Sequence, residues 1–459
     1  MGATAALATF ATETSVSALP EDVANAARCA ILDTIGVALA GSMELAARIV
    51  AEQACHQGGA TECAVWGAGS WASAQNAALA NGTAAHALDF DDTSDSMRGH
   101  PSAPILPAVY AIGERTRAPG RDVLASFAVG VEVACKLGLF TGQDPYDRGW
   151  HVTAAHGVIG ATAGAARLAG LTTAQAQHAI GIAASFAGGL RGNFGTMTKP
   201  LHVGRAAQSA IAAVELAGRG LTANPQAIEG DVGYFAVFGR DRRYAGTDMG
   251  SLLGKPWDIT EPGLNVKAYP CCASTHAAID ASLTVCGGLS LEDIIRVVAA
   301  VPYTAPLILI HHRPADPLSA KFSLEYCVAT ALFDGAVTLT HFTEENVRRQ
   351  DLQALLRRVE HVVPPEWQED NGVAKTGLAR LDVYLRDGTV RHAETTEVRG
   401  SPTRPLSTDD LEAKFLSCAR AAVGEGQARE ILGLVRDFGD LDTLGDLSRL
   451  LAGAPSGRL

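Results

Sequence analysis

The sequence contains few aromatic residues and few charges, and its anions outnumber its cations. Aromatic side chains make up 6% of the 459 residues, which favours closely packed helices over a β-rich sandwich. Lysine and arginine together number 37, against 49 aspartate and glutamate residues, so the net charge is −12. This acidic balance argues against a nucleic-acid-binding surface and against a basic membrane patch.

Several signals with well-defined meanings are also missing. The nine cysteines include no CxxC pair, and their odd number and scattered positions indicate reduced thiols in a cytoplasmic protein. No GxxxxGK[ST] phosphate-binding loop occurs. The chain starts without a basic segment, and no apolar run of 18 residues is free of polar residues, so we expect neither an export signal nor a membrane span.

Alanine-rich segments with helical periodicity fill the first half of the chain. The first covers residues 20–40, and similar segments follow at 74–88, 104–116, 121–140, 152–169, 173–188 and 203–219. They predict a domain of at least six helices. A stretch rich in proline and glycine at 257–269 then marks a domain boundary.

Strand-like patterns are concentrated between about 290 and 400. Residues 294–301 are β-branched, and residues 381–385 alternate before the turn signal Asp387-Gly388. Helical patterns at 273–285, 318–334 and 343–357 accompany these strands, and a helix start at Ser407 opens the C-terminal segment. We therefore predict a mainly α protein with a large helical domain and a smaller α+β lid domain. The predicted boundaries are 1–265 for the first helical part, 266–400 for the lid, and 401–459 for the helices that complete the helical domain.

The densest polar cluster spans residues 86–102 and leaves three interpretations open. It could be a solvated, capped loop, because aspartate and serine favour turns. Its DDxxD pattern, which begins at Asp91, resembles the magnesium-diphosphate motif of isoprenoid synthases, but the second carboxylate cluster and the aromatic pocket are lacking. It could also be an acid–base loop. In this interpretation Asp89 has an orienting role, Thr93 forms a hydrogen bond with the substrate, and His100 transfers protons or binds a carboxylate.

Two further segments carry candidate residues. His151 opens a helix, where the positive helix end favours a neutral imidazole that can accept a proton, although it could serve only as a cap. Its spacing to His156 is not that of a helical metal site, so we infer no zinc. Lys199 stands among small and hydroxyl residues before a helix, which fits either a carboxylate-binding loop or an ordinary surface turn.

The predicted domain boundary and the lid supply three more candidates. Lys267 could bind a carboxylate, and Cys272 could transfer a proton if nearby cations lower its pKa. The adjacent cysteine pair could instead be two small buried hydrophobic residues. Tyr326 lies on an apolar helix, where core packing is the alternative to a catalytic role.

Together these motifs resemble the MmgE/PrpD family, which includes 2-methylcitrate dehydratase, cis-aconitate decarboxylase and iminodisuccinate epimerase. The matching segments cover nearly the whole chain: NGTAAHALDFDDT, GHPS, WHVT, FGTMTKPLHVGRAA, KAYPCC and KFSLEYCVA. The resemblance implies a helical domain with an inserted α+β lid, a homodimer, and no cofactor or metal. The family's active-site positions correspond to Asp89, Thr93, His100, His151, Lys199, Lys267, Cys272 and Tyr326. Cys272 replaces a histidine of the decarboxylase relatives.

The resemblance also implies a reaction class. Family members remove or add a proton beside a carboxylate, and nearby cations stabilise the resulting enediolate. We expect Lys199, Lys267 and Arg98 to bind the carboxylates of the substrate. Either His151 or His100 would act as the base, and Tyr326 or Cys272 would serve the opposite face of the substrate. The predicted function is a lyase that dehydrates a 2-methylcitrate-like hydroxy acid. The alternatives are an epimerase of a dicarboxylate such as iminodisuccinate, a cis-aconitate-type decarboxylase, and a non-catalytic carboxylate-binding protein.

Overall fold

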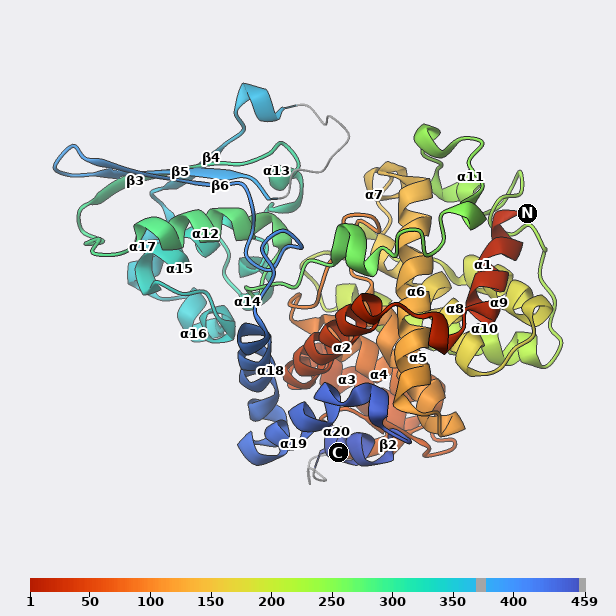
Figure 1. The fold of residues 1–459 in the computed structure, drawn as a ribbon. Coiled ribbons are helices and arrows are strands. Elements are labelled where there is room, and N and C mark those ends of the chain that lie inside the picture. Colours follow the sequence, from red (N-terminus) through yellow and green to blue (C-terminus); the bar gives the residue numbers. More distant parts are fainter. Residues whose placement is uncertain (369–376, 454–459) are drawn as a thin grey trace. The chain divides into compact units, whose positions relative to one another are not determined.

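The computed structural model describes residues 1–368 and 377–453, which form two compact units (Figure 1). The first unit contains residues 1–266 together with the C-terminal segment that begins at Ser407. The second unit contains residues 267–406. The prediction of a mainly helical protein with a smaller α+β part is confirmed.

In its described residues, the regular structure of the first unit is helical apart from one short hairpin. Its helices are α1 (Ala3–Glu13), α2 (Glu21–Gly41), α3 (Leu45–His56), α4 (Ala74–Ala87), α5 (Ser102–Thr116), α6 (Gly120–Thr141), α7 (Asp144–Asp147), α8 (Val152–Leu168), α9 (Thr173–Phe186), α10 (Thr198–Gly218), α11 (Tyr234–Phe238), α18 (Thr408–Val423), α19 (Glu425–Arg436) and α20 (Gly445–Ala452). The hairpin of β1 (Cys63–Val65) and β2 (Ser70–Ala72) was not expected, because strands of three residues show too little alternation to be recognised.

Two helices of this unit, α2 and α6, are long and apolar enough by length and composition to cross a membrane. However, 72% of the most apolar 18-residue stretch of α2 and 94% of that of α6 are buried inside the protein. This is expected for the core helices of a folded protein. Helix α6 also carries buried charges. Lys136 Nζ lies 3.0 Å from Glu132 Oε1 and contacts the carboxylate of Asp258 as well, so this buried ammonium is neutralised.

Helices α4 and α10 pack antiparallel with their backbones in direct contact. A Cβ atom on Gly204 would lie 2.2 Å from the carbonyl oxygen of Leu79, and one on Gly82 would lie 2.9 Å from the Cα atom of Gly204. Neither distance is compatible with a side chain larger than hydrogen. At one end of this contact, Gln75 donates a hydrogen bond to Glu215. The other end therefore brings the C-terminus of α4 next to the N-terminus of α10.

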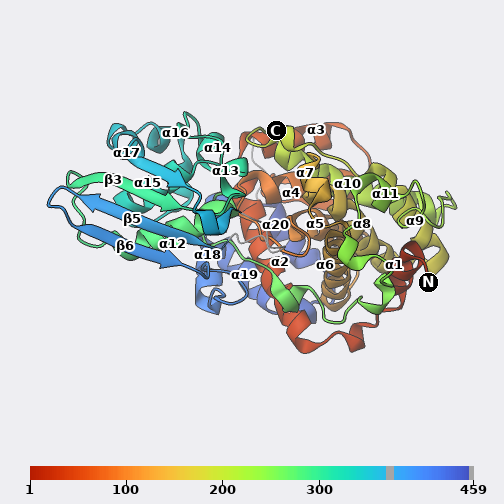
Figure 2. The same cartoon turned by 90° about the horizontal axis from the view of Figure 1, so that it is seen from above.

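The second unit is an α+β structure. Its elements are α12 (His276–Val285), β3 (Ile294–Ala300), α13 (Ala305–Ile308), α14 (Pro317–Ala320), α15 (Leu324–Asp334), α16 (Glu344–Val347), α17 (Gln350–Leu356), β4 (Val359–Val362), β5 (Ala379–Leu385) and β6 (Val390–Thr395). The strand order is β4-β3-β5-β6; β3 pairs with β4 in parallel, and β5 pairs with β3 and β6 in antiparallel orientation. Helices α12 and α15 cover one face of the sheet (Figures 1 and 2). The expected turn at Gly388 joins β5 to β6 and has a positive φ of 89°.

One predicted helix begins earlier in the structure, and two predicted helices are each divided in two. Helix α10 begins at Thr198 rather than at 203, because a proline is tolerated in the first turn of a helix. The segment predicted as one helix at 318–334 contains α14 and α15, since Ser323 accepts a hydrogen bond from the backbone of Tyr326 and starts a new helix. The segment predicted at 343–357 is likewise divided into α16 and α17.

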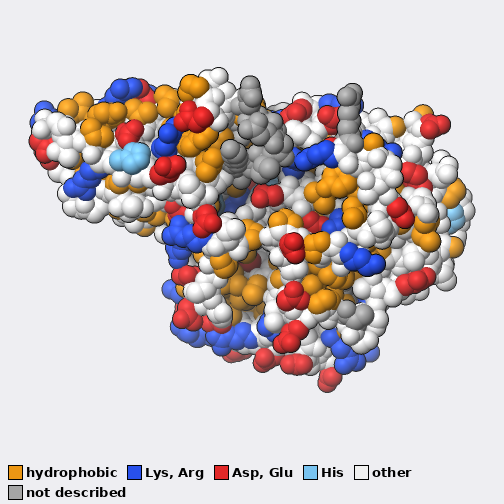
Figure 3. Space-filling model, turned by 45° about the horizontal axis from the view of Figure 1, so that its top comes forward, with side chains coloured by type: hydrophobic (Ala, Val, Ile, Leu, Met, Phe, Trp, Pro, Cys, Tyr) orange, Lys and Arg blue, Asp and Glu red, His pale blue; other side chains and the backbone are white. Residues whose placement is uncertain are grey.

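The face of the molecule shown in Figure 3 carries acidic and basic side chains interspersed with one another. Pairing is also seen on the last helices, where Arg420 lies 3.4 Å and Arg429 lies 2.6 Å from carboxylate oxygens of Glu425. The positive charges of these arginines are therefore compensated by a neighbouring carboxylate. This agrees with a sequence in which acidic residues outnumber basic ones.

We predict that Gly204→Ala destabilises the helical unit by about 1–3 kcal/mol, because the added methyl group forces α4 and α10 apart. The measurement is urea unfolding followed by helical circular dichroism. Gly433→Ala is the matched control, because Gly433 is an exposed position of helix α19 where an added Cβ atom meets nothing within 4 Å. This change should stabilise the protein by about 0.5–1 kcal/mol. Equal stabilities of the Gly204→Ala protein and the wild type would contradict the close contact.

Candidate active site

The candidate site of the first unit is formed where α4 ends. His86 is buried in the last turn of α4, and the chain then reaches Asp89 with a left-handed φ of 53°. Arg98, in the same loop, has a φ of 57°. This conformation costs a residue other than glycine about 1–3 kcal/mol and is concentrated at functional sites. The loop is thus held in a strained form that aims its carboxylates inward.

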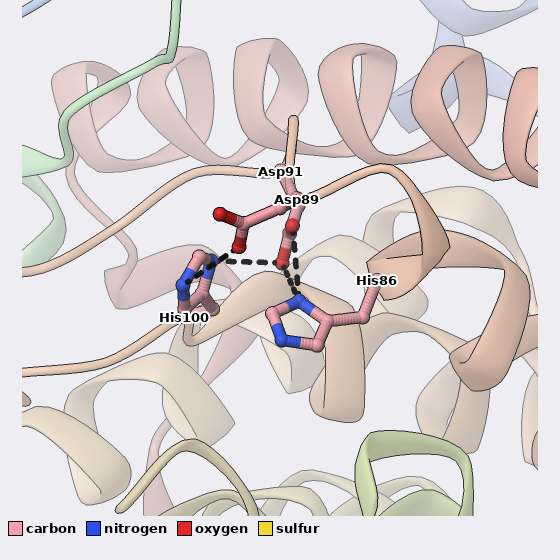
Figure 4. A group of neighbouring side chains, drawn as sticks. All are labelled: His86, Asp89, Asp91 and His100. Carbon is pink, nitrogen blue, oxygen red and sulfur yellow. Dashed lines mark hydrogen bonds and ion pairs between the residues drawn. The ribbon is translucent and has the colours of Figure 1, made fainter. Parts of the chain in front are cut away.

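Two carboxylates lie side by side and face the imidazole of His100 (Figure 4). Asp91 Oδ2 is 3.0 Å from His100 Nδ1 and 2.8 Å from His86 Nδ1. Asp89 Oδ1 is 3.7 Å from His100 Nε2. Burial opposes ionisation of Asp91, but the two imidazoles outweigh it and hold the pKa of this carboxyl well below its usual range. Asp91 is therefore an anion that orients both rings.

Lys199 supplies the cation of the site. Its Nζ atom is 2.6 Å from Asp89 Oδ1 and 5.2 Å from the ring centre of Phe194, and its side chain is buried. The residue lies in the first turn of α10, whose helix dipole adds positive potential. A negatively charged ligand would therefore meet both an ammonium group and a helix N-terminus here.

His151 lies directly before α8 and forms no capping hydrogen bond with that helix. Its ring stacks on that of His86 with centres 5.6 Å apart, and its Nδ1 atom is 3.1 Å from Nδ1 of His202. Burial lowers the pKa of His151 well below its usual value, and the nearby His86 and Lys199 lower it further. The ring is therefore neutral at neutral pH.

His86 is a second neutral imidazole, since burial lowers its pKa to about 4. Among the described residues, the Nε2 atoms of His86 and His151 are buried and have no hydrogen-bond partner. Leaving such groups unpaired costs about 1–3 kcal/mol each, so they are natural contact points for a bound ligand.

The predicted residues Thr93 and Arg98 lie in the same loop with other partners. Thr93 is paired through its backbone with Asn265, to which its N–H donates at 2.9 Å. The guanidinium of Arg98 donates to Gln143 at 2.7 Å. Binding of a carboxylate by Arg98 stays a prediction.

The three aspartates of the DDxxD pattern have different partners. Asp91 faces imidazoles, whereas Asp92 accepts hydrogen bonds from the backbone and hydroxyl of Ser102, and burial raises its pKa to about 7. Asp95 accepts from the side chain of Asn265. Because they do not share one set of partners, the pattern does not form the magnesium-diphosphate motif considered from the sequence.

A metal ion is a separate question. One oxygen or nitrogen atom from each of His86, Asp89, Asp91 and His100 lies within 4.8 Å of the others, so these residues could hold a cation. In the structure, however, the ammonium of Lys199 is bound to Asp89, and both histidines contact Asp91. The site therefore already contains a positive group beside its carboxylates.

The remaining predicted residues belong to the second unit. Lys267 is buried at its start, and Cys272 is buried before a short helical turn, with its N–H donating to the carbonyl of Lys321 at 3.0 Å. Tyr326 is buried on α15 and its hydroxyl donates to the carbonyl of His341 at 2.5 Å. Burial raises the pKa of Tyr326, so the phenol keeps its proton at neutral pH.

Four residues that contact the site were not among the predicted ones: His86, Asp91, His202 and Phe194. All of them fall inside the segments HALDFDD and NFGTMTKPLHVG, which overlap the motifs that resemble the MmgE/PrpD family. The local pattern does not reveal which of several polar residues turn inward, because that depends on the left-handed step at Asp89 and on the packing of α4 against α10.

Comparisons with known proteins agree with this architecture. Residues 5–246 match the MmgE/PrpD N-terminal domain, and residues 269–440 match the MmgE/PrpD C-terminal domain. The chain therefore belongs to the MmgE/PrpD family of enzymes, and the resemblance noted from its motifs is confirmed.

The chain is similar along nearly its whole length to proteins named cis-aconitate decarboxylase. It is 29% identical to that of Homo sapiens over 451 residues, which cover 95% of this chain and 92% of the human protein. It is 29% identical to that of Mus musculus, covering 95% and 91% of the two chains. It is 26% identical to that of Aspergillus terreus (strain NIH 2624 / FGSC A1156), covering 98% and 95%.

A third buried histidine generates a prediction about pH. His156 contacts the hydroxyl of Tyr234 at 2.8 Å, and burial lowers its pKa to about 3. An unfolded histidine has a pKa of about 6.5, so the unfolded chain takes up this proton first as the pH falls. The stabilisation is complete above about pH 6.5 and is lost toward pH 3, with a slope of at most about 1.4 kcal/mol per pH unit.

We therefore expect His156→Gln to reduce the loss of unfolding free energy between pH 7 and pH 5, as measured by urea denaturation at each pH. His56→Gln removes an exposed histidine at the end of α3 and should leave the wild-type pH dependence intact. An unchanged pH dependence in the His156→Gln protein would show that this ring is not buried in its neutral form.

Proposed function

We propose that this chain is a lyase that removes a proton from carbon beside a carboxylate in a small di- or tricarboxylate, and that it dehydrates a 2-methylcitrate-like hydroxy acid. The observation that supports this most directly is the buried pair of Lys199 and Asp89 next to two neutral imidazoles. A cation and a neutral base are the two groups that such a proton abstraction requires.

The proposed dehydration depends on stabilising the negative charge that develops when the proton is removed. Removing a proton beside a carboxylate places a second negative charge on that group as an enediolate, and the ammonium of Lys199 stabilises it. His151 is neutral, and its unpartnered Nε2 atom can accept the proton. His100, which faces Asp89 and Asp91, can pass the proton onward. Protonation of the leaving hydroxyl by an acid then releases water and forms the carbon–carbon double bond.

We propose that Tyr326 or Cys272, both in the second unit, acts as this acid. The phenol of Tyr326 is protonated at neutral pH, as an acid must be, and its hydroxyl donates to the carbonyl of His341 in the structure. We also propose binding of the substrate's carboxylates by Lys267, and a homodimer as the functional form. We further propose a reducing, cytoplasmic location, because the odd number and scattered positions of the nine cysteines are typical of reduced thiols.

Decarboxylation of a cis-aconitate-like acid is the second candidate, because the relatives described above carry that name. It differs in its bond changes: a carbon–carbon bond breaks, carbon dioxide leaves, and the carbanion takes up a proton. Dehydration begins with a base, and His151, which is neutral, can provide it. The cysteine at position 272, where the decarboxylase motif has histidine, supports the same choice.

Proton NMR in D2O separates the candidate reactions. EDTA-treated protein is mixed with 2-methylcitrate, citrate, cis-aconitate or iminodisuccinate, and the spectra are followed with time. We expect new olefinic signals with a hydroxy acid. Loss of carbon dioxide from cis-aconitate would replace the dehydratase by a decarboxylase, and deuterium entry with a changed diastereomer ratio would replace it by an epimerase. A protein that binds these acids without transforming any of them would contradict the enzymatic proposal.

We predict that Lys199→Ala lowers kcat/KM by about 10²–10³-fold, because a buried group that stabilises the developing charge is lost. Initial rates on the acid that the wild-type protein transforms provide the measurement. Arg219→Gln removes an exposed cation at the opposite end of the same helix, roughly 30 Å away, and should keep wild-type rates. Activity of Lys199→Ala close to that of the control would remove Lys199 from the mechanism.

A further inference from the structure

A second group of histidines and a carboxylate lies within the second unit. His312 follows α13, Glu325 stands in the first turn of α15, and His361 is part of β4. Glu325 Oε1 is 2.9 Å from Nδ1 of His312 and 3.2 Å from Nδ1 of His361. The two imidazole rings stack at an angle of 14° with centres 5.4 Å apart. Three separate segments thus direct one side chain each toward the same point.

The burial of this group indicates that a partner is missing. Glu325 is 4% exposed, and in the part of the chain that the structure describes its Oε2 atom is buried without a hydrogen-bond partner. An unpaired buried carboxylate oxygen is more costly than an unpaired neutral polar group, because the charge is also removed from water. The side chain of His312 is 53% exposed, so a small ion can reach the group from solvent.

We propose that His312, Glu325 and His361 form a zinc-binding site that is separate from the candidate active site. Two imidazoles and one carboxylate are a common set of three protein ligands for Zn²⁺, with water in the fourth position. One atom from each residue lies within 4.8 Å of the others. A tetrahedral ion with bonds of about 2.0–2.1 Å needs ligand atoms roughly 3.3 Å apart, which small side-chain rotations supply.

Charge and geometry favour a divalent ion over a simple ion pair. Without a metal, both imidazoles compete for the single atom Glu325 Oε1, while Oε2 stays unpaired. A divalent cation would bind all three side chains at once and neutralise the carboxylate. It would also join three segments: β4, the first turn of α15 and the segment after α13. In the sequence, His361 lies 36 residues and His312 lies 13 residues from Glu325. Because Tyr326 is the next residue on α15, the ion would hold the turn that carries it.

The test is metal binding to the EDTA-treated full-length protein. We expect uptake of one equivalent of Zn²⁺ at this group by calorimetry, and a visible absorption band of tetrahedral Co²⁺ that Zn²⁺ abolishes. His312→Ala and His361→Ala should each weaken binding by at least about 10–100-fold, the effect known for residues that merely support a ligand. The exposed position of His312 makes the first variant safe for folding. Zn²⁺ should also raise the Tm of the wild type but not of Glu325→Gln.

Two controls locate the ion. His392 lies 2.7 Å from Asp382 on the neighbouring strands β6 and β5, an exposed pair without a second histidine, so His392→Ala should bind Zn²⁺ like the wild type. His100→Ala disrupts the other histidine–carboxylate group and should keep this equivalent. The absence of saturable Zn²⁺ uptake by the wild type would overturn the proposal. Uptake that is lost in His100→Ala but unchanged in His312→Ala and His361→Ala would also overturn it.

Discussion

The candidate site of the helical unit depends on the contact between α4 and α10. Gly82 and Gly204 allow the two backbones to meet without intervening side chains. Because the helices run antiparallel, this contact places Asp89, just beyond the end of α4, against Lys199 in the first turn of α10. A methyl group at the crossing would separate the helices by more than the 2.6 Å ion pair tolerates. The small residues that lower helix propensity in this sequence therefore serve the geometry of the site.

Burial then divides the polar groups of the site into charged and neutral ones. Asp91 stays ionised because it is shared by two imidazoles, whereas His86 and His151 stay neutral because they are buried near a cation. A neutral base beside a fixed ammonium group is a combination that water does not provide, since in water both groups would be solvated and mobile. The helical unit thus brings together, before any ligand binds, the two charge states that removal of a proton beside a carboxylate requires.

The sequence predicted the helical class, the smaller α+β part and the family, because periodicity and motifs are local signals. It also located His100, His151 and Lys199 in segments that the structure brings together. It did not predict that Asp91 orients two imidazoles, since the direction of that side chain follows from the left-handed backbone at Asp89.

The group of His312, Glu325 and His361 could not be recognised from the sequence for a related reason. No local spacing joins residues that far apart, and only the packing of β4 beside α15 brings them together. In the same way, the division of the predicted helix at 318–334 depends on the cap formed by Ser323, a residue that could equally have pointed to solvent.

The most direct test of this account is a double-mutant cycle of Asp89→Asn and Lys199→Met, measured as kcat/KM on the acid that the wild-type protein transforms. If the contact between α4 and α10 makes these residues a single unit, the double variant should lose no more activity than the worse single variant. Losses that multiply in the double variant would show that the two residues act independently, and would contradict the account.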